Sequence, residues 1–254
     1  MDHLPPIPPP LLHSRVPNRS AATAPLRACL LSGGSSRRMG TDKALLPHPE
    51  GGTWLERSLR LLGELAMPVS LLSRHPEHLR LARQHATTDA AAAGAANPGP
   101  APLEILAEPP PWEGPLLALH RLMERHPDQR LLLCPVDMPD LTLSALLALR
   151  RAADGAPSAI HIAQSDGGLQ PLLAVLPAEA ALRQHLAAAV LGGERRLQRW
   201  LLQHSYRPVA LEAQALNNCN RPEDIGHRPD AINPTAAAAD RFNPLGKVDR
   251  NGVG

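Results

Sequence analysis

The sequence is poor in aromatic residues, which restricts both its core and the ligands that it can bind. Phe, Trp and Tyr make up only 2% of the 254 residues, although 43% of the chain is hydrophobic. The core must therefore consist mainly of Leu, Ala and Val. Few ring faces remain on which nucleobases could stack, so we do not expect a protein that binds single-stranded nucleic acid.

The sequence also lacks a large excess of charge of either sign. It has 26 Lys and Arg against 24 Asp and Glu, a formal net charge of +2. Because broad nucleic-acid surfaces usually need a strong basic excess, this balance argues against a nucleic-acid partner. It still allows a local cluster of cations, which is all that a small anionic substrate requires.

Cysteine is scarce, and its three positions are far apart. Cys29, Cys134 and Cys219 form no CxxC motif. An odd, scattered set of this kind predicts reduced thiols in a cytoplasmic protein rather than a disulfide framework or a zinc site. His75 and His78 stand three residues apart, but without a third ligand nearby we expect a solvated loop and no metal there.

Long apolar runs are missing too, and the composition indicates one domain with two tails. No run approaches the ~20 residues that a bilayer span needs, so no membrane contact is expected. Residues 1–26 are proline-rich, show no secretory signal, and are predicted to be a disordered N-terminal extension. The domain covers 27–226, with a low-complexity surface loop over 86–102, and a disordered tail is predicted over 227–254.

Short apolar runs alternate with amphipathic stretches along the domain. Strands are predicted over 26–32, 68–74, 103–108, 130–139, 158–164, 171–177 and 206–213, and helices over 53–66, 76–86, 114–127, 141–153, 178–190 and 193–205. Thr53 and Glu56 match a capping box at the start of the first helix. This alternation predicts an α/β fold with a mainly parallel central sheet and helices on both faces. Ligands of such sheets bind beyond the carboxyl ends of the strands.

The first predicted strand ends at a glycine pair followed by cations. Gly33 and Gly34 permit close backbone approach, and backbone N–H groups in such a turn can hold phosphate oxygens. Arg37, Arg38 and Lys43 supply positive charge just downstream. The spacing matches neither GxxxxGK[ST] nor GxGxxG, so neither a Walker A loop nor a dinucleotide-binding fingerprint is predicted.

The most apolar predicted strand ends at a carboxylate. Asp137 follows "RLLLCPV", where an ionised side chain is costly unless it is paired or binds a metal. Mg²⁺ is usually held by one or two carboxylates together with substrate phosphates. We therefore expect Asp137 to be a metal ligand rather than a helix cap. Asp140 is expected in a turn or cap, and the cap of the next helix is expected near Thr142.

Five stretches of the sequence resemble molybdenum cofactor guanylyltransferases, the MobA-type nucleotidyltransferases. "LLSGGSSRRMGTDKALL" is similar to the family signature LxGGxSxRMGxDK, and the others, in order, are "WEGPLLAL", "LLLCPVDMP", "GGERRLQRWL" and "LNNCNRPEDI". The resemblance runs from about 27 to about 225. It implies a three-layer, Rossmann-like nucleotidyltransferase fold. The first motif alone is shared more loosely with other nucleotidyltransferases.

The resemblance also implies a reaction. Such enzymes take GTP and the phosphate of molybdopterin, release pyrophosphate and form a guanine dinucleotide cofactor. The expected cofactor is Mg²⁺, with Mn²⁺ as a substitute, and the substrates are GTP and molybdopterin. Molybdenum-insertion and molybdoenzyme maturation proteins are the expected protein partners in the cytoplasm.

Site residues follow from the matching positions. Lys43, Arg38 and Asp137 would be catalytic, with Asp137 holding the metal. The positions expected to contact substrates are Leu31, Ser32, Gly33, Gly34, Lys43, Glu108, Asp137, Arg195, Arg196, Asn218 and Asn220. The two arginines would lie near the acceptor, and the two asparagines match a late pair in the family.

Several positions depart from the family pattern and leave alternatives open. The second strand ends in "SLLSRH", without the usual Asn, and Glu108 replaces an aspartate. Ser32 stands where Ala is common, and Arg221 where Thr is usual. One alternative is cytidylyl transfer, or transfer to a sugar phosphate, although "SGG" with "DKALL" favours guanylyl transfer over the Ala-Ala-Gly loop of cytidylyl relatives. The other is a non-catalytic carrier of a nucleotide or pterin.

Overall fold

The computed structural model describes residues 24–34, 40–93 and 102–219. Within them, seven strands form one sheet in the order β3-β2-β1-β4-β6-β5-β7. β6 runs antiparallel to its neighbours β4 and β5, and all other neighbouring pairs are parallel. The strands are β1 (Leu26–Leu31), β2 (Val69–Ser73), β3 (Leu103–Ala107), β4 (Arg130–Pro135), β5 (Ile160–Ser165), β6 (Gly168–Pro177) and β7 (Tyr206–Ala210). The predicted, mainly parallel sheet is confirmed.

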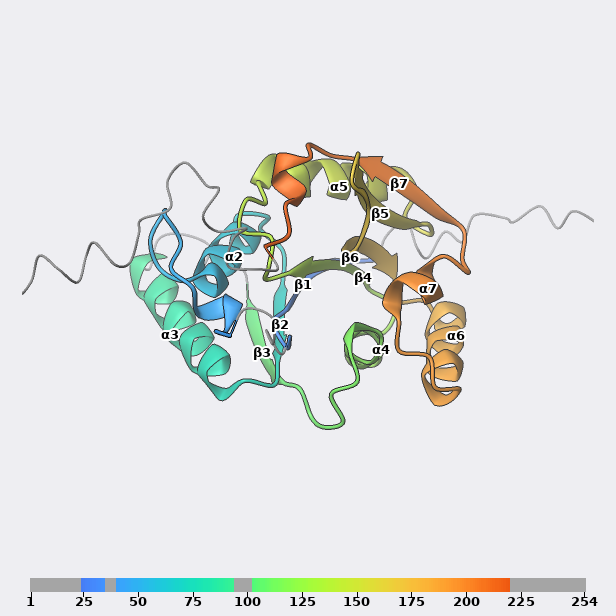
Figure 1. Ribbon diagram of the computed structural model, residues 1–254, viewed down its shortest axis with the longest axis horizontal. Coiled ribbons are helices and arrows are strands. Elements are labelled where there is room, and N and C mark those ends of the chain that lie inside the picture. Colours follow the sequence, from blue (N-terminus) through green and yellow to red (C-terminus); the bar gives the residue numbers. More distant parts are fainter. Residues whose placement is uncertain (1–23, 35–39, 94–101, 220–254) are drawn as a thin grey trace, which may run out of the picture.

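Helices cover both faces of this sheet (Figure 1). They are α2 (Trp54–Gly63), α3 (Pro76–Ala93), α4 (Pro115–Arg125), α5 (Leu143–Gly155), α6 (Ala180–Leu191) and α7 (Leu197–Leu201), with 3₁₀ helices η1 (Lys43–Leu45) and η2 (Gln214–Leu216). Apolar residues of α2, α3 and α5 pack into one core cluster, and those of α4, α6 and α7 into another. The three-layer α/β architecture expected from the sequence is therefore present.

The sheet contributes side chains to both core clusters, because successive residues of a strand point to opposite faces. In β4, Leu131 and Leu133 belong to the core under α4, whereas Leu132 and Cys134 belong to the core under α2 and α5. All six residues of β4 are buried. This explains why the strand is apolar after Arg130, and the next polar residue, Asp137, comes just beyond the carboxyl end of the strand.

Two helix starts follow the sequence signals. The Thr53 N–H donates to Glu56 Oε2 at 2.7 Å, and the Glu56 N–H donates to Thr53 Oγ1 at 3.3 Å, so the predicted capping box of α2 is formed. Hydrogen bonding to the Thr53 backbone lowers the pKa of Glu56. Thr142 caps α5 by accepting from the Ala145 N–H at 3.2 Å, as expected.

Two expected boundaries were wrong. The surface loop predicted over 86–102 begins later, because α3 continues to Ala93. Alanine is the strongest helix former, so an alanine-rich run can extend a helix even where it buries little. The last helix, expected over 193–205, is only α7. There the carboxylate of Glu194 accepts the N–H groups of Arg195 and Arg196, which delays the helix.

The predicted tails lie outside the described residues, apart from 24–26, where Leu26 opens β1. No helix in the described part of the chain is long and apolar enough to cross a membrane.

Candidate active site

A cavity of about 360 Å³ opens at the carboxyl ends of the parallel strands. The chain segments that follow β1, β3 and β4 all reach it, together with the start of α4. Seven residues expected from the sequence line it, namely Leu31, Ser32, Gly33, Gly34, Lys43, Glu108 and Asp137. The strand-end rule of open α/β sheets therefore located the cavity correctly.

The glycine loop approaches Glu108 closely. A Cβ atom on Gly33 would lie 2.8 Å from Glu108 Oε2, whereas one on Gly34 would meet nothing within 4 Å. Glu108 is 9% exposed, and its other oxygen accepts from Arg121 Nη1 at 2.8 Å. This ion pair stabilises a carboxylate that would otherwise be costly to bury. Position 33 must therefore stay small while Glu108 stands there.

Lys43 and Asp137 form an ion pair in the wall of the same cavity. Lys43 Nζ lies 3.4 Å from Asp137 Oδ2, and the side chains are 12% and 27% exposed. Asp42 fixes the approach of Lys43, because its Oδ1 accepts from the Ala44 N–H at 3.1 Å and caps η1. The carboxylate that follows β4 thus has a cation beside it.

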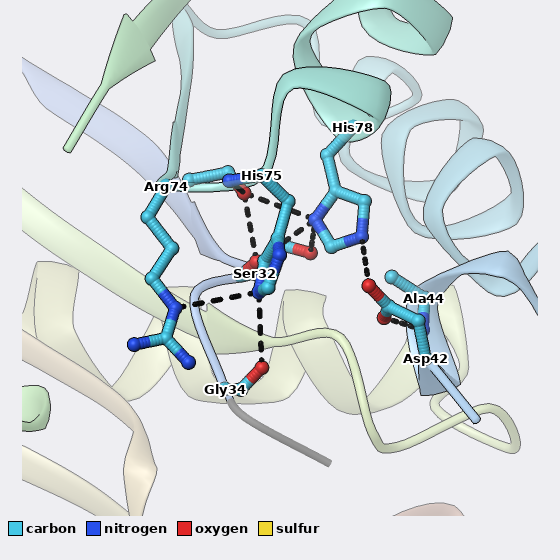
Figure 2. A network of polar contacts seen from close by, with 8 residues as sticks. Ser32, Gly34, Asp42, Ala44, Arg74, His75 and His78 are labelled. Atoms are coloured by element: carbon cyan, nitrogen blue, oxygen red, sulfur yellow. Dashed lines mark hydrogen bonds and ion pairs between the residues drawn. The ribbon is translucent and has the colours of Figure 1, made fainter. Parts of the chain in front are cut away.

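A buried hydrogen-bond network joins the glycine loop to the segment that carries Lys43 (Figure 2). His78 Nδ1 lies 2.9 Å from Ser32 Oγ and 3.0 Å from Ser73 Oγ, and its Nε2 lies 2.9 Å from Asp42 Oδ2. The expectation of a solvated loop was wrong for His78, which is 1% exposed. Pro76 starts α3, which places His78 in the first turn, against the ends of β1 and β2.

Burial is the main influence on His78. It lowers the pKa of the imidazole below the ordinary value of 6.5, although the neighbouring Asp42 carboxylate acts in the opposite direction. The ring is therefore neutral at neutral pH. An Asp42 carboxylate can only accept, so we assign the proton of the neutral ring to Nε2, and Nδ1 then accepts from the Ser32 hydroxyl. The Ser32 carbonyl, which also lies 2.9 Å from Nδ1, accepts from the Ser73 hydroxyl at 2.8 Å.

Arg74 and Trp112 are among the residues of the cavity wall that sequence reasoning missed, as are Asp42 and His78. The Arg74 guanidinium carbon lies 5.3 Å from the centre of the Trp112 ring, within range of a cation–π contact. Trp112 is 51% exposed, and its Nε1 donates to the Glu108 carbonyl at 3.0 Å. Arg74 directly follows β2. The rule that ligands bind beyond the carboxyl ends of the strands, which pointed to Asp137, therefore applies to Arg74 as well.

The late arginines do not line the cavity. Arg195 Nε lies 2.6 Å from Glu113 Oε2. The carbonyl oxygen of Arg195 would lie 3.6 Å from a Cβ atom on Gly114. Arg195 therefore packs against the residues that precede α4. The side chain of Arg196 is 71% exposed and lies 3.8 Å from Glu194. Arg38 lies outside the described residues.

The segment around Asn218 and Cys219 lies beside Asp137, the candidate metal ligand. The Cys219 N–H donates to the Asp137 carbonyl at 3.1 Å, and the neighbouring Asn218 side chain donates to Gln170 Oε1 at 2.8 Å. Asn218 does not itself line the cavity, and Asn220 lies outside the described residues. The roles of both asparagines stay predictions.

The three thiols take no part in the cavity. All three cysteines are free and buried. Burial raises the pKa of Cys29 and of Cys134 to about 12, so neither forms a thiolate near neutral pH.

Comparison with known proteins decides the family. Residues 28–209 match the family model described as the MobA-like NTP transferase domain. The chain belongs to the MobA-like NTP transferase family. A member from Rhodopirellula baltica, named probable molybdenum cofactor guanylyltransferase, is 34% identical over 81% of this chain and 92% of its own length. One of the same name from Synechococcus elongatus is 30% identical over 78% and 94%.

Solved structures agree on the fold of this MobA-like chain. The crystal structure of molybdopterin-guanine dinucleotide biosynthesis protein A from Archaeoglobus fulgidus aligns with a TM-score of 0.58 and 18% identity, covering 78% of this chain and 94% of that one. A 4-diphosphocytidyl-2C-methyl-D-erythritol synthase from Anaerococcus prevotii aligns with a TM-score of 0.60 and 11% identity, covering 82% and 95%. At such identities the likeness shows a shared nucleotidyltransferase fold.

Proposed function

We propose that this protein transfers GMP from GTP to the phosphate of molybdopterin, with or without molybdenum, and releases pyrophosphate. The observation that carries the proposal is the meeting of the glycine loop with the Lys43–Asp137 pair in one cavity. The names of the relatives at 30–34% identity support the choice of GTP and of the pterin acceptor. We also propose that the reaction takes place in the cytoplasm.

Asp137 suits Mg²⁺, with Mn²⁺ as a substitute. The described residues contain no cluster of three or more His, Cys, Asp or Glu side chains that could hold an ion alone. One carboxylate at a cavity wall nevertheless matches the way Mg²⁺ binds, since the remaining ligands come from water and substrate phosphates. A bound Mg²⁺ would neutralise phosphate charge and polarise the reacting phosphorus.

The residues of the chain supply positioning and charge. An oxygen of the acceptor phosphate attacks the α-phosphorus of GTP, and the bond from that phosphorus to pyrophosphate breaks. The attacking phosphate is already ionised, so no strong general base is required. Backbone N–H groups after β1 would hold phosphate oxygens, while Lys43 with Arg38 would stabilise the charge that develops on pyrophosphate.

Glu108 would contact the nucleotide from the other side of the loop. Its Oε2 is directed at Gly33 while Arg121 occupies Oε1. The carboxylate is therefore held in place rather than free to follow the substrate, as a contact that selects one nucleotide requires.

A nucleotide panel tests the proposed reaction. The purified full chain, Mg²⁺ and molybdopterin are combined with GTP, CTP, ATP or UTP in parallel, and pyrophosphate release is measured. Release with GTP alone is the expected result. Release with CTP alone would identify a cytidylyltransferase instead. Binding of GTP without release, from any of the four nucleotides, would favour a carrier protein.

A further inference from the structure

His78 is the point at which three separate chain segments meet (Figure 2). Its Nδ1 contacts Ser32 at the end of β1, with 2.9 Å to both the hydroxyl and the carbonyl oxygen, and Ser73 at the end of β2. Its Nε2 contacts Asp42, just before η1. The Ser73 hydroxyl also donates to the Ser32 carbonyl at 2.8 Å, which closes the network.

The contacts continue from Asp42 to Lys43 and Asp137, the proposed catalytic residues of the cavity. One carboxylate oxygen of Asp42 faces His78, and the other caps η1 through the Ala44 N–H. Lys43 is the first residue of η1, and its Nζ lies 3.4 Å from Asp137. The position of the His78 ring therefore bears on both the glycine loop and the lysine that faces the metal candidate.

The ring is directional in this setting. With the proton on Nε2, the ring donates to Asp42 and accepts from the Ser32 hydroxyl, while the Ser32 carbonyl beside Nδ1 accepts from the Ser73 hydroxyl. The other titratable groups near the ring are His75, whose ring centre lies 4.7 Å away, and Glu77 on the same helix. His75 Nε2 lies 3.1 Å from the carbonyl oxygen of Gly34, so it also borders the loop.

We propose that His78 is a positioning residue for guanylyl transfer. It holds Ser32 at the start of the glycine loop and Asp42 before Lys43, in the arrangement that sets Lys43 beside Asp137. This inference rests on the proposed function and deepens it. His78 is not catalytic, because it acts through Asp42 and Ser32, and the expected consequence of its loss is a misplaced lysine and loop.

A second buried histidine supplies a matched control. His126 is 4% exposed, its Nε2 lies 3.1 Å from Ser70 Oγ and 3.3 Å from Glu104 Oε2, and burial lowers its pKa as well. It contacts a serine of the same strand, β2, at the opposite end from Ser73. A substitution there disturbs a similar network without touching the cavity.

Two substitutions separate the two sides of the His78 ring. The amide nitrogen of Gln stands three bonds from Cβ, as Nε2 does, so His78→Gln can keep the contact to Asp42. The amide of Asn stands two bonds from Cβ, as Nδ1 does, so His78→Asn keeps only the serine side. We expect His78→Asn to lower kcat/KM for GTP about 10- to 100-fold, and His78→Gln to restore most of that loss.

The pH profile adds a readout that a merely structural role would not move. Protonation of His78 turns Nδ1 into a donor, so it can no longer accept from the Ser32 hydroxyl and donates instead to the Ser32 carbonyl, 2.9 Å away. Because burial lowers the pKa of His78 in the folded protein, the ratio of wild-type to His78→Gln kcat/KM should stay constant near neutral pH and fall only in the acid range below the ordinary imidazole pKa. Titration of the substrate phosphates cancels in this ratio. In the same experiment, His126→Asn should show a pH-independent ratio to the wild type.

The outcomes separate the two proposals. If the wild type turns over GTP but His78→Asn and His126→Asn lose the same activity per folded molecule, His78 has no positioning role. If the wild type releases no pyrophosphate from GTP, the proposed function fails and this inference fails with it. Should the His78 variants not fold, Asp42→Asn decides, because it keeps the cap on η1 but removes the charge that orients His78. Wild-type kcat/KM in Asp42→Asn would overturn the inference.

Discussion

The two ends of β2 carry the same chemistry in different surroundings. At the carboxyl end, Ser73 and His78 meet Asp42; at the amino end, Ser70 and His126 meet Glu104. Both histidines are buried, and burial lowers the pKa of each. A buried serine–histidine–carboxylate cluster is therefore not, by itself, a sign of an active site.

The difference lies in the charges around each cluster. Glu104 is surrounded by Arg27, Arg125 and His126. Burial would raise the pKa of Glu104, but hydrogen bonds from Arg125 and Ser70 outweigh it and hold the pKa below 4.5. The charges at the amino end thus satisfy one another. At the carboxyl end, the cluster borders a glycine loop and a cavity that also contains Lys43 and Asp137.

Removing a carboxylate at each end gives the largest expected contrast. Asp137→Ala should abolish pyrophosphate release while leaving the circular dichroism spectrum unchanged, because Asp137 is the carboxylate proposed to hold Mg²⁺. The matched control variant is Asp154→Ala. Asp154 Oδ1 lies 2.8 Å from Nη1 of Arg130, the first residue of β4, so this variant removes a carboxylate at the amino end of that strand. It should keep turnover. Full activity of Asp137→Ala, with unchanged Mg²⁺ dependence, would remove the basis for the metal site.

A pair of glycine substitutions tests the packing at the carboxyl end. Gly33→Ala should lower the free energy of unfolding by about 1 kcal/mol or more, because its Cβ would press on a carboxylate held by Arg121. Gly34→Ala meets no atom within 4 Å and should change stability much less. Urea unfolding followed by circular dichroism measures both. Equal destabilisation of the two variants would contradict the close contact between Gly33 and Glu108.

Acidic pH should lower the stability of the folded protein, with contributions from the histidines at both ends of β2. The histidines whose pKa burial lowers are His78, His126, His161 and His204. Below about 6.5 the unfolded chain takes up protons at these positions more readily than the folded one, so the free energy of unfolding should fall as pH decreases through this range. Urea unfolding at several pH values checks this. His78→Gln and His126→Gln should each make the dependence shallower, and an unchanged slope in both would contradict the assignment.

The smallest expected effect is spectroscopic. Trp54 and Trp200 are each 1% exposed, whereas Trp112 is 51% exposed and lines the cavity. Addition of GTP and Mg²⁺ should therefore change tryptophan fluorescence through Trp112. The change should vanish in Trp112→Phe. A signal that persists in that variant would place the perturbation elsewhere.

The sequence predicted the sheet and the cavity because both depend on local patterns. Strand β4 is apolar from Leu131 to its end. The alternation of strands and helices predicts parallel pairing, which places residues 33 and 137 at one edge of the sheet. The capping box at Thr53 depends on residues three apart. None of these predictions depends on contacts between residues that are distant in the sequence.

The contacts that sequence reasoning missed all join distant segments. His78 faces Asp42 from 36 positions away, and Lys43 reaches Asp137 across 94. The spacing of His75 and His78 indicates only whether they could bind a metal; it carries no signal that His78 is buried and links distant segments by hydrogen bonds. The predicted end of α3 is too early, because low complexity is typical of loops but the alanine in this run favours helix.

Hydrogen–deuterium exchange with and without GTP and Mg²⁺ tests the central claim most directly, since it locates the ligand without requiring turnover. The account predicts protection in peptides that cover the ends of β1 and β4, including Gly33, Lys43 and Asp137, and no change around Glu104 and His126. Protection confined to the amino ends of the strands, or none near Gly33 and Asp137 at saturating GTP, would contradict it.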